Sequence, residues 1–200
     1  MSEPISGVCV LVLAAGQGSR YRERSDEDKL LAPVSEAPDA PPVLAMTLGS
    51  LQGIAERLVV VTREDNLALR AWLEQERSRF GAEVFAVRTR GLGHTLAQAI
   101  RHCPAEKGWL VALGDMPYVH PDTARRVASA IDRARLVVPV YDGQRGHPRG
   151  IGHAHGARLL ELDGERGAQA LFVGSTVCEI DVDDRGVIDD IDRPEDRRSR

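Results

Sequence analysis

The sequence lacks the long apolar runs of a membrane protein. No stretch approaches the roughly 18 consecutive apolar residues that a transmembrane helix needs. The N-terminus has no basic segment ahead of its short apolar run, so a secretory signal is not expected. With 42% hydrophobic and 28% charged residues, the composition is that of an ordinary globular protein. We therefore expect a cytoplasmic protein with no membrane partner.

Cysteine and lysine are also scarce. Cys9, Cys103 and Cys178 are too few and too scattered for a disulfide framework or a zinc quartet, so we expect them to be buried as small apolar side chains. The formal net charge of -4 gives no general attraction to nucleic acid. Only Lys29 and Lys107 are lysines among the 26 basic residues. Either lysine is therefore a stronger candidate for function than a single arginine.

Short apolar runs alternate with segments of helical periodicity in the first two thirds of the chain. Strands are expected at residues 8–13, 58–62, 82–87, 109–113 and 136–140, with helices at 43–54, 66–80, 94–102 and 122–134. This alternation predicts one α/β domain over residues 1–200, with a Rossmann-like, doubly wound, mostly parallel sheet and helices on both faces. The proline-rich stretch at 35–42 is expected to be a loop.

The amino-acid composition of the sequence changes after residue 140. Glycine, histidine, arginine and proline dominate residues 142–156. Short helices are then expected at 156–162 and 167–172, and strands at 177–182 and 187–191. Because no linker precedes this part, we interpret residues 141–196 as a lobe of the same domain that closes over the sheet.

A glycine-rich loop follows the first strand, with the sequence Leu13-Ala14-Ala15-Gly16-Gln17-Gly18-Ser19-Arg20. In a doubly wound sheet the carboxyl end of the first strand faces the ligand crevice, and small residues there let backbone N–H groups approach phosphates. Tyr21 replaces the third glycine of a dinucleotide fingerprint, and the GK[ST] of a P-loop is absent. The loop therefore predicts phosphate binding without either of these two standard motifs.

The loop, with Lys29 after it, resembles the LAAGxSxRMGxxK signature of the MobA/MocA-like NTP transferases, which include the molybdenum cofactor cytidylyltransferases. Four more segments match in the family's order: GLGHTL at 91–96, LGDMP at 113–117, GQRGHP at 143–148 and DDIDRPED at 189–196. They resemble the family's GMGxSL, LGDMP, GxRGHP and DIDTPED. The resemblance covers about residues 8 to 196 and implies the fold of the nucleotide-diphospho-sugar transferases.

The resemblance implies a chemistry as well. A nucleoside monophosphate, CMP from CTP, would be transferred to the phosphate of a molybdopterin-type cofactor with release of pyrophosphate, and a molybdoenzyme would receive the product. Asp115, with Asp190 or Asp192, would hold Mg²⁺, an ion that favours one or two carboxylates together with substrate phosphates. Lys29 and Arg20 would act with Asp115 as the catalytic residues.

The binding residues follow from the same resemblance. About residues 8–140 would form the nucleotide-binding half and 141–196 the acceptor side. The acceptor would contact Arg145, Gly146, His147 and Pro148. The nucleotide would contact the residues of the two glycine motifs, namely Leu13, Ala14, Ala15, Gly16, Gln17, Gly18, Ser19, Gly91, Gly93 and Thr95.

The chain departs from the family pattern in three places, the first being Ser19, which stands one place later than the serine of the signature. Eight residues, YRERSDED, separate Arg20 from Lys29 where the family has four, and GERGAQ at 164–169 stands in place of GDxGAR. If the GERGAQ segment shapes the acceptor pocket, the acceptor differs from the family's usual one. These departures keep open a non-catalytic or weakly active delivery module that binds a nucleotide or cofactor. A flavin-linked oxidoreductase is a further alternative.

Three narrower alternatives also stay open. LAAG resembles the cytidylyl branch more than the LAGG of the guanylyl branch, but the difference is one residue, so GTP remains a candidate substrate.

Asp192 is equally suited to cap a helix that has Pro194 in its first turn and Glu195 completing a capping box. A loop trio of His147, His153 and His155 could hold a metal, although such residues are more often surface polar groups.

Overall fold

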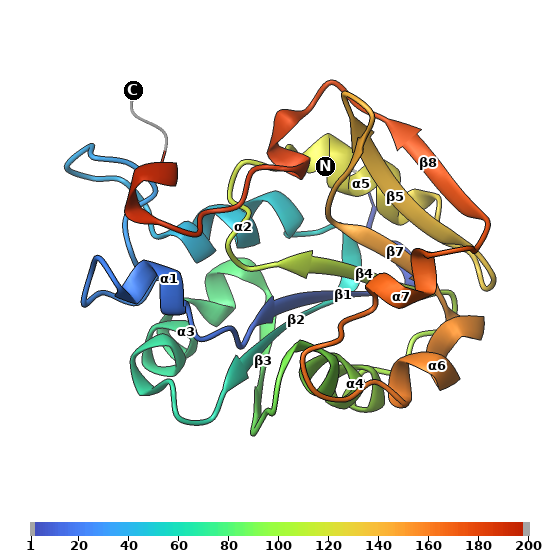
Figure 1. Cartoon of the computed structure of the whole chain (residues 1–200), viewed down its shortest axis with the longest axis horizontal. Coiled ribbons are helices and arrows are strands. Elements are labelled where there is room, and N and C mark those ends of the chain that lie inside the picture. The colour runs from blue at the N-terminus through green and yellow to red at the C-terminus, as the bar shows by residue number, and fades with distance from the viewer. Residues whose placement is uncertain (1–2, 198–200) are drawn as a thin grey trace.

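The computed structural model describes residues 3–197, which build an eight-stranded sheet with helices on both faces (Figure 1). The strands are β1 (Ile5–Ala14), β2 (Ala55–Arg63), β3 (Ala82–Val87), β4 (Gly108–Leu113), β5 (Leu136–Tyr141), β6 (Gln144–Arg145), β7 (Arg149–Gly152) and β8 (Val177–Asp181). Their order is β3-β2-β1-β4-β7-β5-β6, with β8 paired to β5. The predicted fold class is confirmed.

Apart from the short first helix, which the sequence did not predict, the helices match the expected segments to within a few residues. They are α1 (Ser19–Arg22), α2 (Val43–Leu51), α3 (Leu67–Phe80), α4 (Leu92–His102), α5 (Pro121–Ser129), α6 (Gly156–Leu160) and α7 (Gln169–Phe172). α5 ends five residues before the expected residue 134. None of the helices within residues 3–197 is long and apolar enough to cross a membrane.

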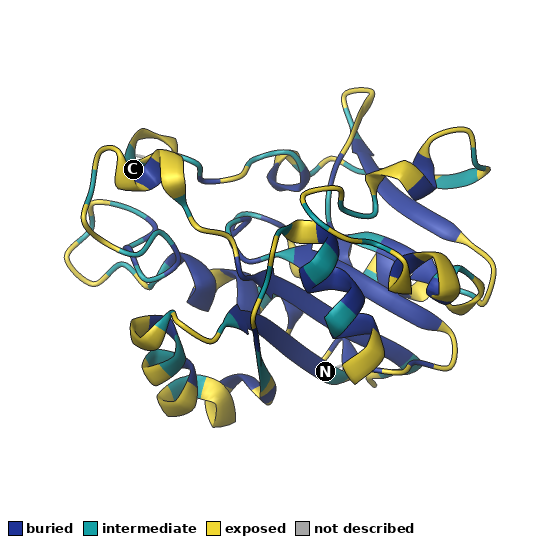
Figure 2. Cartoon of the chain, turned by 60° about the horizontal axis from the view of Figure 1, so that its bottom comes forward, coloured by how far each residue is buried: buried dark blue, intermediate teal, exposed yellow. Residues whose placement is uncertain are grey.

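The central strand β1 separates two apolar cores because successive side chains of a strand point to opposite faces. Val10 and Val12 pack with residues of α2, α3 and α5, whereas Leu11 packs with residues of α4, α6 and α7. β1 is parallel to both neighbours, with Leu11 opposite Val59 of β2 and Val111 of β4. The strands β1, β2, β4 and β5 consist mostly of buried residues (Figure 2). Cys9 and Cys103 are buried as expected, while Cys178 is partly exposed.

The second half of the chain enters the sheet, which corrects the expectation of a lobe that closes over it. β7 lies between β4 and β5 and is antiparallel to both, and β8 is parallel to β5. β7 has the sequence RGIG, so it carries one apolar residue and shows no strand pattern. Its glycines are required by close packing: a Cβ on Gly150 would lie 2.7 Å from Cγ1 of Ile131, and one on Gly152 would lie 2.3 Å from the carbonyl oxygen of Asp132.

The expected strand at 187–191 does not form. A short 3₁₀ helix spans Arg185–Val187, and the following backbone is irregular. Val187 and Ile191 are both fully buried, so their apolar character reflects two anchors in the core rather than a strand. The backbone N–H of Ile191 donates to the carbonyl oxygen of Asp115 at 2.9 Å. The C-terminal segment is thereby fixed to the end of β4.

Candidate active site

A cavity of about 530 Å³ lies at the carboxyl ends of β1 and β4. The glycine-rich loop after β1 forms one wall, and the turn before α4 forms another. Nine of the ten predicted nucleotide-binding residues line the cavity, together with Lys29 and Asp115. These nine are Leu13, Ala14, Ala15, Gly16, Gln17, Gly18, Ser19, Gly91 and Thr95. The structure therefore brings together predicted site residues that are up to 102 positions apart, from Leu13 to Asp115.

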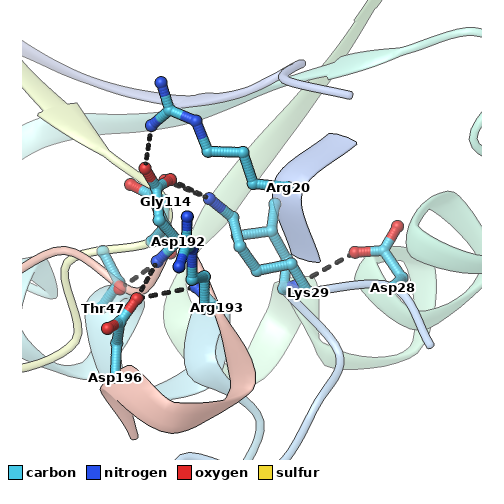
Figure 3. Close-up of polar contacts among 10 residues, drawn as sticks. Arg20, Asp28, Lys29, Thr47, Gly114, Asp192, Arg193 and Asp196 are labelled. Atoms are coloured by element: carbon cyan, nitrogen blue, oxygen red, sulfur yellow. Dashed lines mark hydrogen bonds and ion pairs between the residues drawn. The ribbon is translucent and has the colours of Figure 1, made fainter. Parts of the chain in front are cut away.

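Lys29 pairs with two carboxylates, of which Asp115 lines the cavity and Asp192 does not. Its Nζ lies 2.6 Å from Oδ2 of Asp115 and 3.4 Å from Oδ1 of Asp192, and Arg20 pairs with the other oxygen of Asp192 at 2.5 Å (Figure 3). Burial alone would lower the pKa of Lys29, but the two carboxylates outweigh it and raise that pKa above its ordinary value. Lys29 is therefore a cation at neutral pH.

The longer interval before Lys29 is accommodated at the surface. Tyr21 is 1% exposed and anchors the start of the interval, whereas most of residues 23–27 are exposed. At the far end, Asp28 accepts a hydrogen bond from the side-chain amide of Asn66 at 2.6 Å, which ties the loop to the start of α3. The additional residues bulge outward between these two anchors, and Lys29 still returns to the cavity.

The loop that carries Asp115 is held by its backbone. The N–H of Gly114 donates to the carbonyl oxygen of Leu13 at 3.0 Å, and the buried hydroxyl of Thr47 donates to the carbonyl oxygen of Gly114 at 3.0 Å. Ile191 binds the carbonyl oxygen of Asp115 from the C-terminal segment. Because none of these bonds uses the Asp115 carboxylate, that group is available to the cavity.

Asp115, Asp190 and Asp192 form a cluster in which one carboxylate oxygen of each lies within 4.8 Å of the others. Burial, with added repulsion from Asp192 and Asp115, raises the pKa of Asp190 above its ordinary value. Burial has the same tendency at Asp192, but hydrogen bonds from Arg20 and charge from Lys29 hold its pKa below the ordinary range. Three close oxygen donors with mutual repulsion fit a hard divalent cation. Both acidic candidates from the C-terminal motif are therefore in the cluster.

Asp192 is not the helix cap considered as its alternative role. The 3₁₀ helix Pro194–Asp196 begins after Arg193, and the carboxylate of Asp196 accepts from the backbone N–H groups of Asp192 at 3.0 Å and Arg193 at 2.7 Å. Glu195 instead pairs with Arg24. Because Asp196 satisfies the free N–H groups, the side chain of Asp192 is left to face Lys29.

Gly93 supports the cavity wall without lining it. It is buried, and its N–H donates to the carbonyl oxygen of Gly164 at 2.9 Å. A Cβ on Gly93 would lie 2.2 Å from the carbonyl oxygen of Arg166, and one on Gly91 would lie 2.4 Å from that of Gly164. The GERGAQ segment thus packs against the nucleotide-side turn, and Glu165 from it lines the cavity.

The four predicted acceptor residues do not line this cavity. Arg145 is exposed and pairs with Glu179 at 2.6 Å, while the backbone N–H of His147 donates to the carbonyl oxygen of Val187 at 2.8 Å. Burial, with repulsion from Arg149, lowers the pKa of His147 to about 3. His147 and Pro148 line a separate small hollow, and Gly146 lies tightly against Val187.

The histidine trio does not converge on a metal. His153 Nδ1 lies 2.7 Å from the carbonyl oxygen of Ala105, and His155 Nε2 lies 2.9 Å from that of Ala134. His147 is packed elsewhere. Within residues 3–197 the aspartate cluster is the one group of at least three such side chains with suitable geometry.

Sequence reasoning missed several residues of the cavity wall. Some flank the glycine motifs, and Arg63 ends β2, so a search of all carboxyl strand ends would have found it. Asp28 and Glu165 carry no such signal, because the packing of distant loops decides their position. The missed lining residues are Arg22, Asp28, Leu30, Arg63, Thr89, Arg90, Leu92, Leu113 and Glu165.

Comparison with known families agrees with this geometry. A family model described as the MobA-like NTP transferase domain matches residues 10–177. The chain belongs to this family. Among curated relatives of this MobA-like NTP transferase, the bifunctional protein GlmU of Marinobacter nauticus is 31% identical over 148 residues, and that of Aromatoleum aromaticum is 32% identical over 130 residues. These alignments cover 73% and 64% of this chain but 30% and 27% of the relatives, so the chain spans less than a third of their length.

Solved structures share the fold over nearly the whole chain. Rv0371c from Mycobacterium tuberculosis superposes with a TM-score of 0.75 at 26% identity, covering 98% of this MobA-like NTP transferase and 96% of that chain. A manganese complex of Rv0371c gives a TM-score of 0.73, also at 26% identity, with 94% and 95% covered. A nucleotidyl transferase from Methanothermobacter thermautotroptrophicus has the same fold, with a TM-score of 0.75 at 21% identity and coverage of 94% and 93%.

Proposed function

We propose that this MobA-like NTP transferase transfers CMP from CTP to the phosphate of a molybdopterin-type cofactor and releases pyrophosphate. The observation that carries the proposal is that Lys29, which lines the cavity together with Asp115 and the glycine loop, forms ion pairs with both Asp115 and Asp192. A cation, an acidic cluster and a loop of free backbone N–H groups together suit a triphosphate that arrives with a divalent ion. A molybdoenzyme would then receive the product.

The proposed reaction needs charge neutralisation more than a base. A phosphate monoester has a second pKa of about 6, so the acceptor is largely a dianion at neutral pH and attacks without losing a proton to the protein. The main barrier is the approach of two anions. Lys29, Arg20 and the N–H groups of the loop from Ala15 to Ser19 would offset charge on the triphosphate. The pyrophosphate leaves with the bonding electrons of the broken α–β bond.

Asp115, Asp190 and Asp192 would hold the divalent ion, which we propose to be Mg²⁺. The fit rests on the three oxygen donors within 4.8 Å of one another, and the manganese complex of Rv0371c supports a divalent ion in a relative of the same fold. When bound, the ion would supply positive charge across the phosphates. The three aspartates would supply the oxygen ligands, and Lys29 would lie between these carboxylates and the glycine loop. A Cβ on Gly18 would lie 3.7 Å from the Cβ of Lys29, so the lysine is beside that loop.

The position of Lys29 favours the enzyme over a delivery module. The long interval after Arg20 favours a delivery module only if it carries Lys29 away from the glycine loop. Lys29 instead lines the cavity with Asp115. No observation in residues 3–197 favours a flavin-linked oxidoreductase.

Pyrophosphate release tests the proposal directly. The protein is incubated with Mg²⁺, a molybdopterin-type acceptor and one of CTP, GTP, ATP or UTP, and pyrophosphate is quantified. We expect release with CTP that depends on both the acceptor and the metal. Thermal shift with each NTP is measured alongside, because selective binding stabilises the native state. Binding without release with this acceptor would contradict the proposed reaction, and release with GTP alone would replace cytidylyl by guanylyl transfer.

A further inference from the structure

We propose that Glu165 determines which nucleobase the cavity accepts, by taking a hydrogen bond from an exocyclic amino group. Between the two pyrimidine nucleotides it would therefore favour CTP over UTP. The inference rests on the proposed function, because it requires a nucleotide in the cavity. It adds a residue of the 163–167 loop, which the sequence placed with the acceptor, to the nucleotide side of the site.

The two ends of the cavity differ in chemistry. One end carries Lys29, Asp115 and the glycine loop, which suit phosphates and a cation. The other end is formed by Gly91 and Leu92, and the side chain of Leu92 is unusually accessible for a large apolar residue, with 42% of the residue exposed. An uncharged ring gains from contact with such an apolar surface, whereas a triphosphate does not. The base therefore belongs at the Leu92 end, where Glu165 also lines the wall.

The backbone around Glu165 is fixed to the turn before α4. On its N-terminal side, Asp163 pairs with Arg90 at 3.1 Å, and the carbonyl oxygen of Gly164 accepts from Gly93. On its C-terminal side, a Cβ on Gly167 would lie 2.8 Å from Cδ2 of Leu92. These contacts hold the loop close against the wall on both sides of Glu165. A side chain on a fixed loop can select a ligand group with little loss of freedom on binding.

The other polar groups at this end are already engaged. The hydroxyls of Thr89 and Thr95 lie 2.6 Å apart, and both also bond to the carbonyl oxygen of Gly91. Arg90 is paired with Asp163. By contrast, the carboxylate of Glu165 has neither a hydrogen bond nor an ion pair with any residue from 3 to 197.

An ionised carboxylate only accepts hydrogen bonds, and this decides the expected preference. The amino group at C4 of cytosine donates to a glutamate, whereas uracil presents an oxygen at the same position. The carboxylate of Glu165 would repel this uracil oxygen and would have no hydrogen-bond donor opposite it. The same charge also disfavours a reversed nucleotide with its triphosphate at the Leu92 end.

The test compares the affinities of CTP and UTP, measured by calorimetry with Mg²⁺, in the full-length chain and in Glu165→Gln. The glutamine amide can turn its NH₂ group toward the uracil oxygen. We expect the wild-type preference for CTP over UTP to fall by about tenfold or more, the value of one hydrogen bond to a charged group. Glu161→Gln is the matched control, because Glu161 is exposed at the end of α6 and does not line the cavity. It should keep the wild-type ratio.

A second variant separates lost recognition from altered structure. Glu165→Ala removes the acceptor without adding a donor, so it should weaken CTP and leave UTP unchanged or improved. Unchanged ratios in both variants, with NTPs still bound, would overturn the role of Glu165 and leave the proposed function standing. If the wild-type protein binds none of the four NTPs, both the inference and the proposed function are overturned.

Discussion

At the scale of single residues, the site depends on a balance of charge between three carboxylates and two cations. Lys29 pairs with Asp115 and Asp192, and Arg20 pairs with Asp192, at N–O distances of 2.5 to 3.4 Å. Asp190 lies in the same cluster of carboxylates. Removing one member leaves a partner without its counter-charge in a place that is only partly open to water. Substitutions here should therefore preserve shape and change only charge.

Asp115→Asn should keep the fold and lose turnover by at least about a hundredfold, if the charge contributes several kcal/mol to the transition state. The fold should survive because the backbone, and not the carboxylate, anchors this loop to Leu13, Thr47 and Ile191. Pyrophosphate release measures the effect, and circular dichroism checks the structure. Glu195→Gln, which alters an exposed ion pair, is the control. Near-normal turnover of Asp115→Asn would remove Asp115 from the chemistry.

Lys29→Met should lower turnover by about a hundredfold or more. The substitution removes the positive charge that we propose offsets the charge of the triphosphate. The second lysine gives a matched control, since Lys107 is exposed and its side chain packs near Gly7, outside the residues that line the cavity. Steady-state rates and unfolding temperatures are measured for both variants. A loss of thermal stability in Lys29→Met with an unchanged rate would show that the longer loop has taken the lysine out of the reaction.

His147 should make the protein less stable in mild acid. Its pKa is about 3 in the folded chain against an ordinary 6.5, so below pH 6.5 the unfolded state binds the proton more readily and stability falls as pH falls. From pH 7 to pH 5 the loss from this residue is about 2 kcal/mol, at about 1.4 kcal/mol per pH unit below 6.5. Urea unfolding at both pH values measures it, and His147→Gln should lack this part. Equal losses in both proteins would contradict the assignment.

Sequence reasoning selected two residues that the structure places in the cavity wall, Lys29 and Asp115. Lys29 stands out because the chain has only two lysines, and Asp115 because it follows the end of a buried strand after one glycine. Glu165 could not be found in this way, because nothing in a surface GERGAQ segment shows which turn it will pack against. The predicted N-cap was one residue too early: the 3₁₀ helix has Arg193 at its N-cap, and the carboxylate of Asp196 accepts from the backbone N–H groups of Asp192 and Arg193.

At the scale of secondary structure elements, close backbone packing links the turn before α4 to the loop at 163–167. Gly93→Ala should destabilise the fold by about 1–3 kcal/mol, the usual cost of overpacking, because its methyl group would meet the carbonyl oxygen of Arg166 at 2.2 Å. Gly49→Ala in α2 is the control: nothing lies within 4 Å of its Cβ position, and a helical alanine should stabilise by about 0.5–1 kcal/mol. Urea unfolding compares them. Equal stability of Gly93→Ala and wild type would show that the 163–167 loop gives way easily.

Elements with a strong apolar period were predictable, and those without one were not. β1, with VCVLVL within it, and β4, with WLVAL, are buried runs whose character is plain from sequence. β7, with the sequence RGIG, has two glycines at positions where a Cβ would collide with neighbouring atoms. Such a strand is specified by tertiary packing, so propensity and periodicity could not show it.

At the scale of the whole molecule, the two halves share one sheet. A fragment of residues 1–140 would lack Ile151, Leu159 and Phe172, all buried, and would leave the edges of β4 and β5 uncovered. We expect this fragment to show no cooperative unfolding transition, whereas the full chain should show one. Circular dichroism during urea titration measures both. A sharp transition for the fragment would mean that the predicted nucleotide-binding half folds without the rest.

The reversed direction of β7 has a further consequence for how such a site can change. Parallel strands deliver only their carboxyl ends to the ligand edge, but β7 pairs Arg149 with Val111 and Gly152 with Gly108, so it starts where β4 finishes. The segment between β6 and β7, which carries His147 and Pro148, therefore reaches this edge of the sheet at the start of a strand and not at its end. Substitutions and insertions in that segment can be tested while the register of the parallel strands stays intact. This segment can therefore change in sequence and length independently of the glycine loop after β1.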